Sequence, residues 1–127
     1  MARIINICNA KGGTGKTTTA LNLSAYLAAL GKYVLLIDLD AQANATSGLR
    51  IKVEEDHQHI YHAIVNEEPV APIIRKTSLF GFDILPAGSS LAGATVELAT
   101  MDNREFKLKR TLNSIRTNYD YIIIDSA

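Results

Sequence analysis

Cysteine, net charge and long apolar runs are all scarce in this chain of 127 residues. The single cysteine, Cys8, excludes a disulfide framework and is expected to be a small buried side chain in a reducing cytoplasm. Thirteen basic and thirteen acidic residues cancel, so bulk charge provides no attraction to DNA or to an anionic membrane. The apolar residues before Asn9 are too few for a secretory signal or a membrane span. These absences favour a cytoplasmic protein with one hydrophobic core.

A glycine-rich segment with lysines and threonines separates an apolar run from a helical pattern. Residues 10–19 read AKGGTGKTTT. They follow an apolar run over Ile4 to Cys8, which is typical of a buried strand. They precede a helix predicted over Thr17 to Leu30, with Gly31 as its C-terminal stop. A strand, a glycine loop and a helix in this order are the context that a phosphate-binding loop requires.

The residue types in this segment suit a nucleoside triphosphate. Glycines let backbone N–H groups approach phosphate oxygens, and the following helix directs the positive end of its dipole at the anion. Lys16 supplies a point charge between the outer phosphates, Thr17 offers a hydroxyl to magnesium, and Thr18 can donate to an inner phosphate. The predicted cofactors are therefore ATP and Mg²⁺. From the loop itself, the predicted nucleotide-binding residues are Gly12, Gly13, Thr14, Gly15, Lys16, Thr17 and Thr18.

Three aspartates follow unbroken apolar runs. Asp38 and Asp40 follow YVLLI, and Asp125 follows YIII. Such runs are typical of parallel strands buried on both faces, and ligands of α/β sheets bind beyond the carboxyl ends of the strands. We predict that Asp38 and Asp125 join Thr17 at a magnesium site, and that Asp40 orients the attacking water. A preference of aspartate for turns explains any one of the three, but explains all three together poorly.

The remaining pattern completes an α/β fold with a parallel sheet flanked by helices, the fold class of a P-loop NTPase. A third strand is predicted over Phe82 to Leu85, before Pro86. The last strand begins near Tyr121, which makes about four strands. Further helices are predicted over Ile60 to Val65, Val70 to Arg75, Leu91 to Leu98 and Asn103 to Thr117.

Four segments of the chain resemble the ParA/Soj family of chromosome and plasmid partition ATPases, which carry the deviant phosphate loop of the ParA and MinD class. They are KGGTGKTTTALNLSAYLA, VLLIDLDAQANATSGL, LPAGSSLAGATVEL and YDYIIIDSA. The resemblance implies that two subunits enclose two ATP molecules and that Lys11, the signature lysine, reaches the partner's nucleotide. It implies that Asp40 polarises the hydrolytic water. The implied catalytic residues are thus Lys11, Lys16 and Asp40, with Lys11 also bound to nucleotide.

The resemblance also carries expectations about partners and extent. It implies an ATP-dependent homodimer, associated with the nucleoid, that binds DNA nonspecifically until a ParB-like activator triggers hydrolysis. It implies the strand order third, second, fourth, first. Residues 1–127 would then be the N-terminal part of a single ATPase domain, truncated after the strand that ends at Asp125. With the far edge of the first strand unpaired, we expect this fragment to associate or aggregate.

Some positions depart from the family pattern. Ala10 replaces the first glycine of the usual phosphate loop, Ala41 stands where proline is usual after Asp40, and Ala43 stands where glycine is frequent. These departures affect details of the loops. The class of protein is unaffected.

Other function classes remain open. A MinD-like membrane-cycling ATPase shares the loop and Asp40, but needs a C-terminal amphipathic helix. A reductase of the nitrogenase iron-protein type needs cluster-ligating cysteines, for which Cys8 is wrongly placed. A P-loop metabolic phosphotransferase needs an acceptor pocket. A remnant that binds nucleotide without hydrolysis would lose turnover and keep ATP affinity.

Two clusters of polar residues could form binding sites, but solvent-exposed side chains are the favoured interpretation of both. His57, His59 and His62 have a spacing that a transition metal could use, yet no cysteine accompanies them. A basic helix with interleaved acidic residues could contact nucleic acid, but an ordinary solvated face is favoured. Its basic residues are Arg104, Lys107, Lys109, Arg110 and Arg116.

Overall fold

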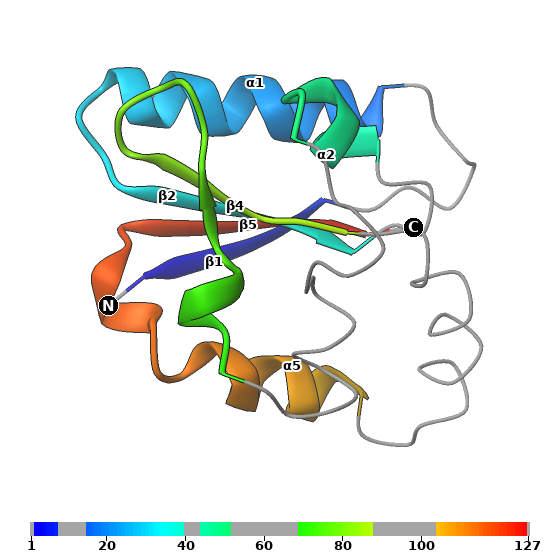
Figure 1. Cartoon of the computed structure of the whole chain (residues 1–127), viewed down its shortest axis with the longest axis vertical. Helices are drawn as coiled ribbons and strands as arrows, with labels where there is room; N and C mark the ends of the chain where they lie inside the picture. Colours follow the sequence, from blue (N-terminus) through cyan, green and yellow to red (C-terminus); the bar gives the residue numbers. More distant parts are fainter. Residues whose placement is uncertain (1, 8–14, 40–43, 52–68, 88–103, 127) are drawn as a thin grey trace.

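The computed structural model describes residues 2–7, 15–39, 44–51, 69–87 and 104–126, with the side chains of 104–107 excepted. The described residues form one five-stranded sheet between helices on its two faces (Figure 1). Across the sheet the order is β1-β5-β2-β4-β3, and β3 is antiparallel to β4 while the other neighbours are parallel. The strands are β1 (Arg3–Ile7), β2 (Val34–Leu39), β3 (Arg75–Lys76), β4 (Phe82–Leu85) and β5 (Tyr121–Ser126).

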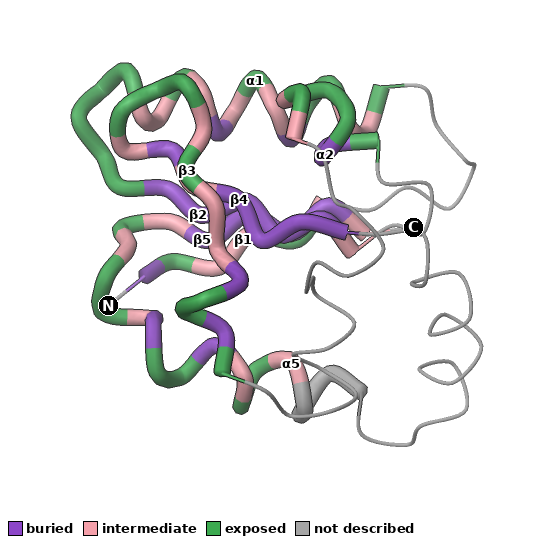
Figure 2. Tube along the Cα trace, in the orientation of Figure 1, coloured by how far each residue is buried: buried purple, intermediate pink, exposed green. Residues whose placement is uncertain are grey.

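The two central strands are buried on both faces (Figure 2). In β2, Leu35 and Ile37 face one apolar cluster, whereas Val34 and Leu36 face the other, because successive side chains of a strand alternate. All four are fully buried. Complete burial of one such side chain contributes about 1.5–3 kcal/mol, which explains why the sequence shows an unbroken apolar run here.

The sheet separates the two apolar clusters, and helices cover each of its faces. The α1 helix (Lys16–Ala29) and the short α2 helix (Asn44–Gly48) cover one face, and α5 (Arg104–Leu112) covers the other (Figure 1). In α1, Ala20 and Ser24 are fully buried, and their small side chains permit a close approach to neighbouring elements. The helix ends at the predicted glycine, since Gly31 has φ 86°, a conformation that favours glycine.

The predicted strand order is confirmed for the four long strands, which lie in the order β4-β2-β5-β1. The sequence did not predict β3. The segment from Val70 to Arg75, predicted as a helix, instead forms a single 3₁₀ turn over Ala71–Ile73, and the chain is extended from Ile74. The two residues of β3 then pair with β4 in a hairpin whose loop spans residues 77–81. A two-residue strand is too short to show an alternating pattern in the sequence.

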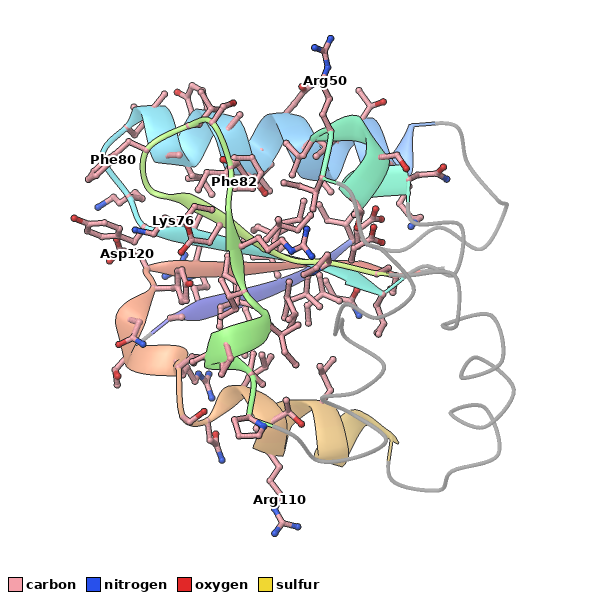
Figure 3. The ribbon with its side chains drawn as sticks, in the orientation of Figure 1. Arg50, Lys76, Phe80, Phe82, Arg110 and Asp120 are labelled. Atoms are coloured by element: carbon pink, nitrogen blue, oxygen red, sulfur yellow. The ribbon has the colours of Figure 1, made fainter. Side chains whose placement is uncertain are left out.

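The helix predicted over Asn103 to Thr117 is also shorter than expected. After Leu112, the Ile115 N–H bonds to the Leu112 carbonyl over 3.1 Å, three residues back, and a 3₁₀ helix follows over Arg116–Asn118. Such bonds tighten and terminate a helix. The Lys109 and Arg110 side chains are exposed, as expected of a solvated face, and Arg110 extends away from the body (Figure 3). No helix among the described residues is long and apolar enough to cross a membrane.

The predicted helices at 60–65 and 91–98, the three histidines and Cys8 lie outside the described residues. At the amino ends of the strands, Tyr33 and Phe80 make an edge-to-face contact with ring centroids 6.1 Å apart. Phe80 is 86% exposed and lies at the same end of the molecule as Lys76 and Asp120 (Figure 3). Asp38 and Asp125 lie at the opposite end of the sheet, near the carboxyl ends of β2 and β5.

Candidate functional site

Two buried aspartates lie side by side at the carboxyl ends of neighbouring strands. Asp38 near the end of β2 is in register with Asp125 near the end of β5. Neighbouring strands are about 4.8 Å apart, so the two residues are adjacent. Each follows by two positions a residue of the apolar cluster beneath α1, Leu36 and Ile123 respectively, and alternation therefore places both carboxylates on the α1 face.

The Asp125 carboxylate is held by the first two residues of α1. Lys16 Nζ forms an ion pair with Asp125 Oδ1, and Thr17 Oγ1 donates a hydrogen bond to Asp125 Oδ2 over 3.0 Å. The Asp125 side chain is fully buried and that of Lys16 is 8% exposed. A buried carboxylate requires such partners, because an unpaired charge away from water is costly. The strand end and the helix start are therefore joined through both carboxylate oxygens.

The N-cap residue of α1 provides no side-chain cap. Gly15 is the N-cap residue and makes no side-chain hydrogen bond, and no acidic residue occupies the first turn. The first intrahelical bond runs from the Thr19 N–H to the Gly15 carbonyl over 2.9 Å. Backbone N–H groups at such a start, together with the helix dipole, attract anions. Here that property coincides with the Lys16 ammonium.

The Asp38 carboxylate has different partners. The N–H and the hydroxyl of Thr46, in α2, both donate to Asp38 Oδ2, over 2.9 Å and 2.6 Å. The Thr46 hydroxyl oxygen in turn accepts a hydrogen bond from the Ala87 N–H over 3.0 Å. All three residues are buried. Asp38 thereby acts as a non-local cap for the start of α2.

The donor atoms at these strand ends suit a hard divalent cation. The Lys16 ammonium pairs with the Asp125 carboxylate, and the Asp38 carboxylate lies beside Asp125 on the neighbouring strand. The hydroxyl of Thr17 and the carboxylate of Asp125 are oxygen donors of the kind that Mg²⁺ prefers. Among the described residues there is no group of three or more acidic, histidine or cysteine side chains that could hold a metal by themselves. Mg²⁺ is usually held by one or two carboxylates, water and phosphate oxygens.

The structure brings together several of the residues predicted for the site. Lys16, Thr17 and Asp125 are in direct contact, and Asp38 lies beside Asp125. Thr18 is exposed in the first turn of α1. The other predicted site residues lie outside the described residues: Lys11, Gly12, Gly13, Thr14 and Asp40.

Sequence reasoning missed Thr46 as a partner of Asp38. The residue lies eight positions after Asp38 and 41 positions before Ala87, so no short motif contains the three together. The available signal is weak: a threonine near the start of a short helix, where hydroxyl residues commonly make capping bonds.

A third aspartate lies far from these two. Asp83 in β4 accepts a hydrogen bond from the Tyr119 hydroxyl over 2.8 Å on the α5 face, near the amino ends of the strands. Burial, together with the hydrogen bond and charge of Asp83, raises the pKa of Tyr119 above its usual range. The Tyr119 hydroxyl thus stays protonated as a donor at physiological pH. This pair ties β4 to the segment that precedes β5, at the opposite end of the sheet from Asp38 and Asp125.

Comparison with known proteins identifies the family. Residues 2–127 match a family model described as an AAA domain. The chain belongs to this family. It is 50% identical over 125 residues to the sporulation initiation inhibitor protein Soj of Bacillus subtilis (strain 168), which covers 98% of this chain and 49% of Soj. It is 48% identical over 125 residues to the chromosome partitioning protein ParA of Myxococcus xanthus (strain DK1622), which covers 98% of this chain and 44% of that ParA.

A solved structure supports the fold. The cobyrinic acid a,c-diamide synthase of Mycobacterium smegmatis, with bound ADP and magnesium, matches with a TM-score of 0.89 and 34% identity, over 98% of this chain and 51% of the synthase. The resemblance to ParA/Soj proteins and the P-loop NTPase fold, both predicted from the sequence, are confirmed. The chain spans about half the length of the curated relatives it matches.

Proposed function

We propose that this chain is part of a Mg-ATP-dependent partition ATPase of the ParA/Soj type. The observation that carries the proposal is the contact between Asp125 and the start of α1, where Lys16 and Thr17 bind its two carboxylate oxygens. A glycine turn without a nucleotide needs neither a lysine nor a threonine at these positions. The ParA and Soj relatives add the partition role.

The proposed roles follow from the chemistry of each side chain. Lys16 and the first N–H groups of α1 bind the outer phosphates, and Thr17 with Asp125 holds magnesium directly or through water. Bound magnesium would neutralise charge on the phosphate oxygens. Asp38 stays a prediction as a metal-site residue, and its Oδ2 accepts both hydrogen bonds that Thr46 donates.

The roles of the residues outside the described part rest on the sequence. We propose that Asp40 orients the hydrolytic water and that Lys11 reaches the nucleotide of a partner subunit. Gly12, Gly13 and Thr14 would provide backbone N–H groups to the phosphates. The N-terminal half of a single ATPase domain is the proposed extent of residues 1–127, in accord with the half-length match to the relatives.

The proposed partners are a second copy of the protein, nonspecific DNA and a ParB-like activator, in the cytoplasm. Because the chain has no net charge, its DNA-binding surface would lie in the part of the relatives that this chain does not cover. The isolated 127-residue chain is expected to turn ATP over weakly or not at all.

The decisive experiment uses the full-length protein with Asp40→Ala, which should stall hydrolysis and preserve the ATP-bound state. Retention on nonspecific DNA is measured with and without Mg-ATP, at low and high salt. We expect ATP-dependent retention that weakens with salt, because phosphate contacts release counterions. ATP-driven dimerisation without DNA retention would contradict the partition role, and absent ATP binding would contradict the nucleotide site itself.

A second candidate is a metabolic P-loop enzyme. The similarity to the cobyrinic acid a,c-diamide synthase favours it over the remaining alternatives. ATP turnover that depends on a small acceptor and is indifferent to DNA would select this candidate.

A further inference from the structure

The loop between β3 and β4 carries an exposed apolar tip. Among the described residues, Phe80 is the most exposed large apolar side chain, at 86%, and its neighbour Leu79 is 47% exposed. The ring of Tyr33, which is 52% exposed, meets the Phe80 ring edge to face and thus joins the same cluster. Single exposed apolar residues are ordinary, but an exposed cluster of them commonly marks an interaction surface.

Backbone and side-chain hydrogen bonds fix the conformation of this loop. The Thr77 hydroxyl donates to the Phe82 carbonyl over 2.7 Å and accepts the Leu79 N–H over 3.1 Å. Gly81 has φ 81°, which favours glycine, and its carbonyl accepts the Val34 N–H over 2.7 Å. The exposed tip is therefore held on β2 and β4 before any partner binds. A pre-organised surface loses little conformational freedom on binding.

Two cations flank the apolar tip. Lys76 immediately precedes the loop, Lys32 immediately precedes Tyr33, and both lysines are exposed. The Lys32 backbone lies against the loop, since a Cβ placed on Gly81 would be 3.0 Å from the Lys32 carbonyl oxygen. Neither lysine forms an ion pair with a carboxylate of the described residues. Asp120, which lies at the same end of the molecule as Lys76 (Figure 3), accepts the Tyr33 N–H over 2.8 Å. The two ammonium groups outnumber this carboxylate.

The size and charge of this surface distinguish between possible partners. We refer to Lys32, Tyr33, Lys76, Leu79 and Phe80 as the hairpin patch. A stable protein interface uses about 20–30 residues on each side, so five residues form too small a surface for a specific protein complex. A second copy bound through the same patch would bring like charges together. A lipid bilayer needs no matching shape, because aromatic rings settle among its headgroups and lysines are attracted to anionic phosphates.

We propose that the hairpin patch is a peripheral binding site for an anionic lipid membrane. Leu79 and Phe80 enter the headgroup region, and Lys32 and Lys76 bind lipid phosphates. The inference goes beyond the proposed ATPase function, since the patch lies at the opposite end of the sheet from Asp125. The zero net charge of the chain does not oppose it, because attraction in salt solution is screened beyond about 10 Å and depends on the local lysines. So few side chains give weak, reversible binding.

The test measures co-sedimentation of the full-length protein with lipid vesicles. One set of vesicles contains phosphatidylcholine mixed with phosphatidylserine, and the other contains phosphatidylcholine alone. We expect binding to the anionic vesicles to be stronger by about fivefold or more and to weaken at high salt, because each lysine near the surface adds attraction. Equal binding to the two sets, or binding to neither, would overturn the inference.

Variants of Phe80 test the apolar contribution. Phe80→Ser should weaken binding to anionic vesicles about tenfold or more, because the ring is lost from the lipid. Phe80→Trp should bind at least as tightly as wild type, and its fluorescence should shift to shorter wavelength when vesicles are added, since tryptophan favours the membrane interface. The side chain is exposed, so neither change removes core contacts. Binding of Phe80→Ser within about twofold of wild type, or an unchanged Phe80→Trp spectrum, would overturn the inference.

Arg110→Gln is the matched control for Lys76→Gln. Both changes remove one exposed positive charge, but Arg110 lies in α5 and extends away from the body (Figure 3). Lys76→Gln should weaken vesicle binding about threefold or more, whereas Arg110→Gln should change it less than about twofold. Losses of equal size in the two variants would overturn the inference, because positive charge anywhere on the surface would then suffice.

Three further results would assign the hairpin patch to a different occupant and overturn the inference. A dimer that Phe80→Ser dissociates in the absence of lipid would assign the patch to a second copy. Loss of DNA retention in Phe80→Ser, with vesicle binding unchanged, would assign it to nucleic acid. Failure of iodide to quench the indole fluorescence of Phe80→Trp without lipid would show that the rest of the polypeptide covers it.

Measurements of ATP turnover separate this inference from the proposed function. Phe80→Ser should keep kcat for ATP hydrolysis within about twofold of wild type when vesicles are absent, and a larger fall would overturn the separation of the patch from the nucleotide site. A wild-type protein that does not turn over ATP, but binds anionic vesicles through Phe80, would remove the proposed function and support this inference.

Discussion

Asp38 and Asp125 occupy equivalent positions in the sheet and have different partners. They are in register on neighbouring parallel strands, face the same side and are fully buried. Asp125 meets an ammonium and a hydroxyl from the start of α1, whereas Asp38 meets an amide and a hydroxyl from α2. The described partners of each carboxylate therefore come from the helix that packs over its strand end. The strand pattern itself does not distinguish the two.

The largest effect is expected from removal of the Asp125 carboxylate. Asp125→Ala would remove the carboxylate that pairs with Lys16, whose side chain is 8% exposed. Removal of one partner of a buried ion pair costs about 3–5 kcal/mol. We also expect the magnesium dependence of ATP affinity to disappear. Urea unfolding and ATP titration with and without Mg²⁺ measure the two effects, and a destabilisation below about 1 kcal/mol would contradict the first.

A smaller effect is expected on the Asp38 side. Asp38→Ala leaves the Thr46 N–H and hydroxyl buried without their acceptor, at a cost of about 1–3 kcal/mol. If Asp38 acts mainly on Thr46, ATP affinity in the presence of Mg²⁺ should change less than about threefold. The same titration applied to Asp38→Ala and Asp125→Ala provides the comparison. Equal losses of magnesium dependence would instead place both carboxylates at the metal, as the sequence predicts.

The smallest effect is expected at the third aspartate, away from the site. Tyr119→Phe removes the hydrogen bond to Asp83, which should cost about 1 kcal/mol and leave ATP affinity unchanged. Because the folded state raises the pKa of Tyr119, this contribution is fully present below the ordinary tyrosine pKa of about 10. It is lost progressively as pH rises above that value. The difference in free energy of unfolding between the two proteins should therefore be largest at neutral pH and shrink at alkaline pH. A difference that stays constant with pH would be inconsistent with this pKa shift.

The sequence predicted those features that depend on local patterns. The apolar run before Asp125 indicated a strand buried on both faces, and the phosphate loop located the start of α1 next to it. Alternation along β2 and β5 then requires both aspartates to face α1. The four long strands and their order were correct for these reasons, with the order taken from the resemblance to ParA/Soj.

The features that sequence reasoning missed depend on contacts between distant segments. Thr46 meets Ala87 across 41 positions, and no local signal predicts this hydrogen bond. The β3 strand has only two residues, and it pairs with β4 in a hairpin. The prediction of a helix over Val70 to Arg75 left no place for this strand. In each case tertiary contacts decided between local alternatives of similar energy.

The two edges of the sheet, as the described residues form it, differ in their capacity to accept another strand. At one edge, β3 offers two residues, Arg75 and Lys76, and short charged edges resist further pairing. At the other, β1 offers five residues, of which Ile4, Ile5 and Ile7 are partly exposed. A further strand can therefore pair more readily at one edge than at the other. Any strand added from a longer polypeptide or from a second copy is expected to pair with β1, which is the strand that precedes the phosphate loop.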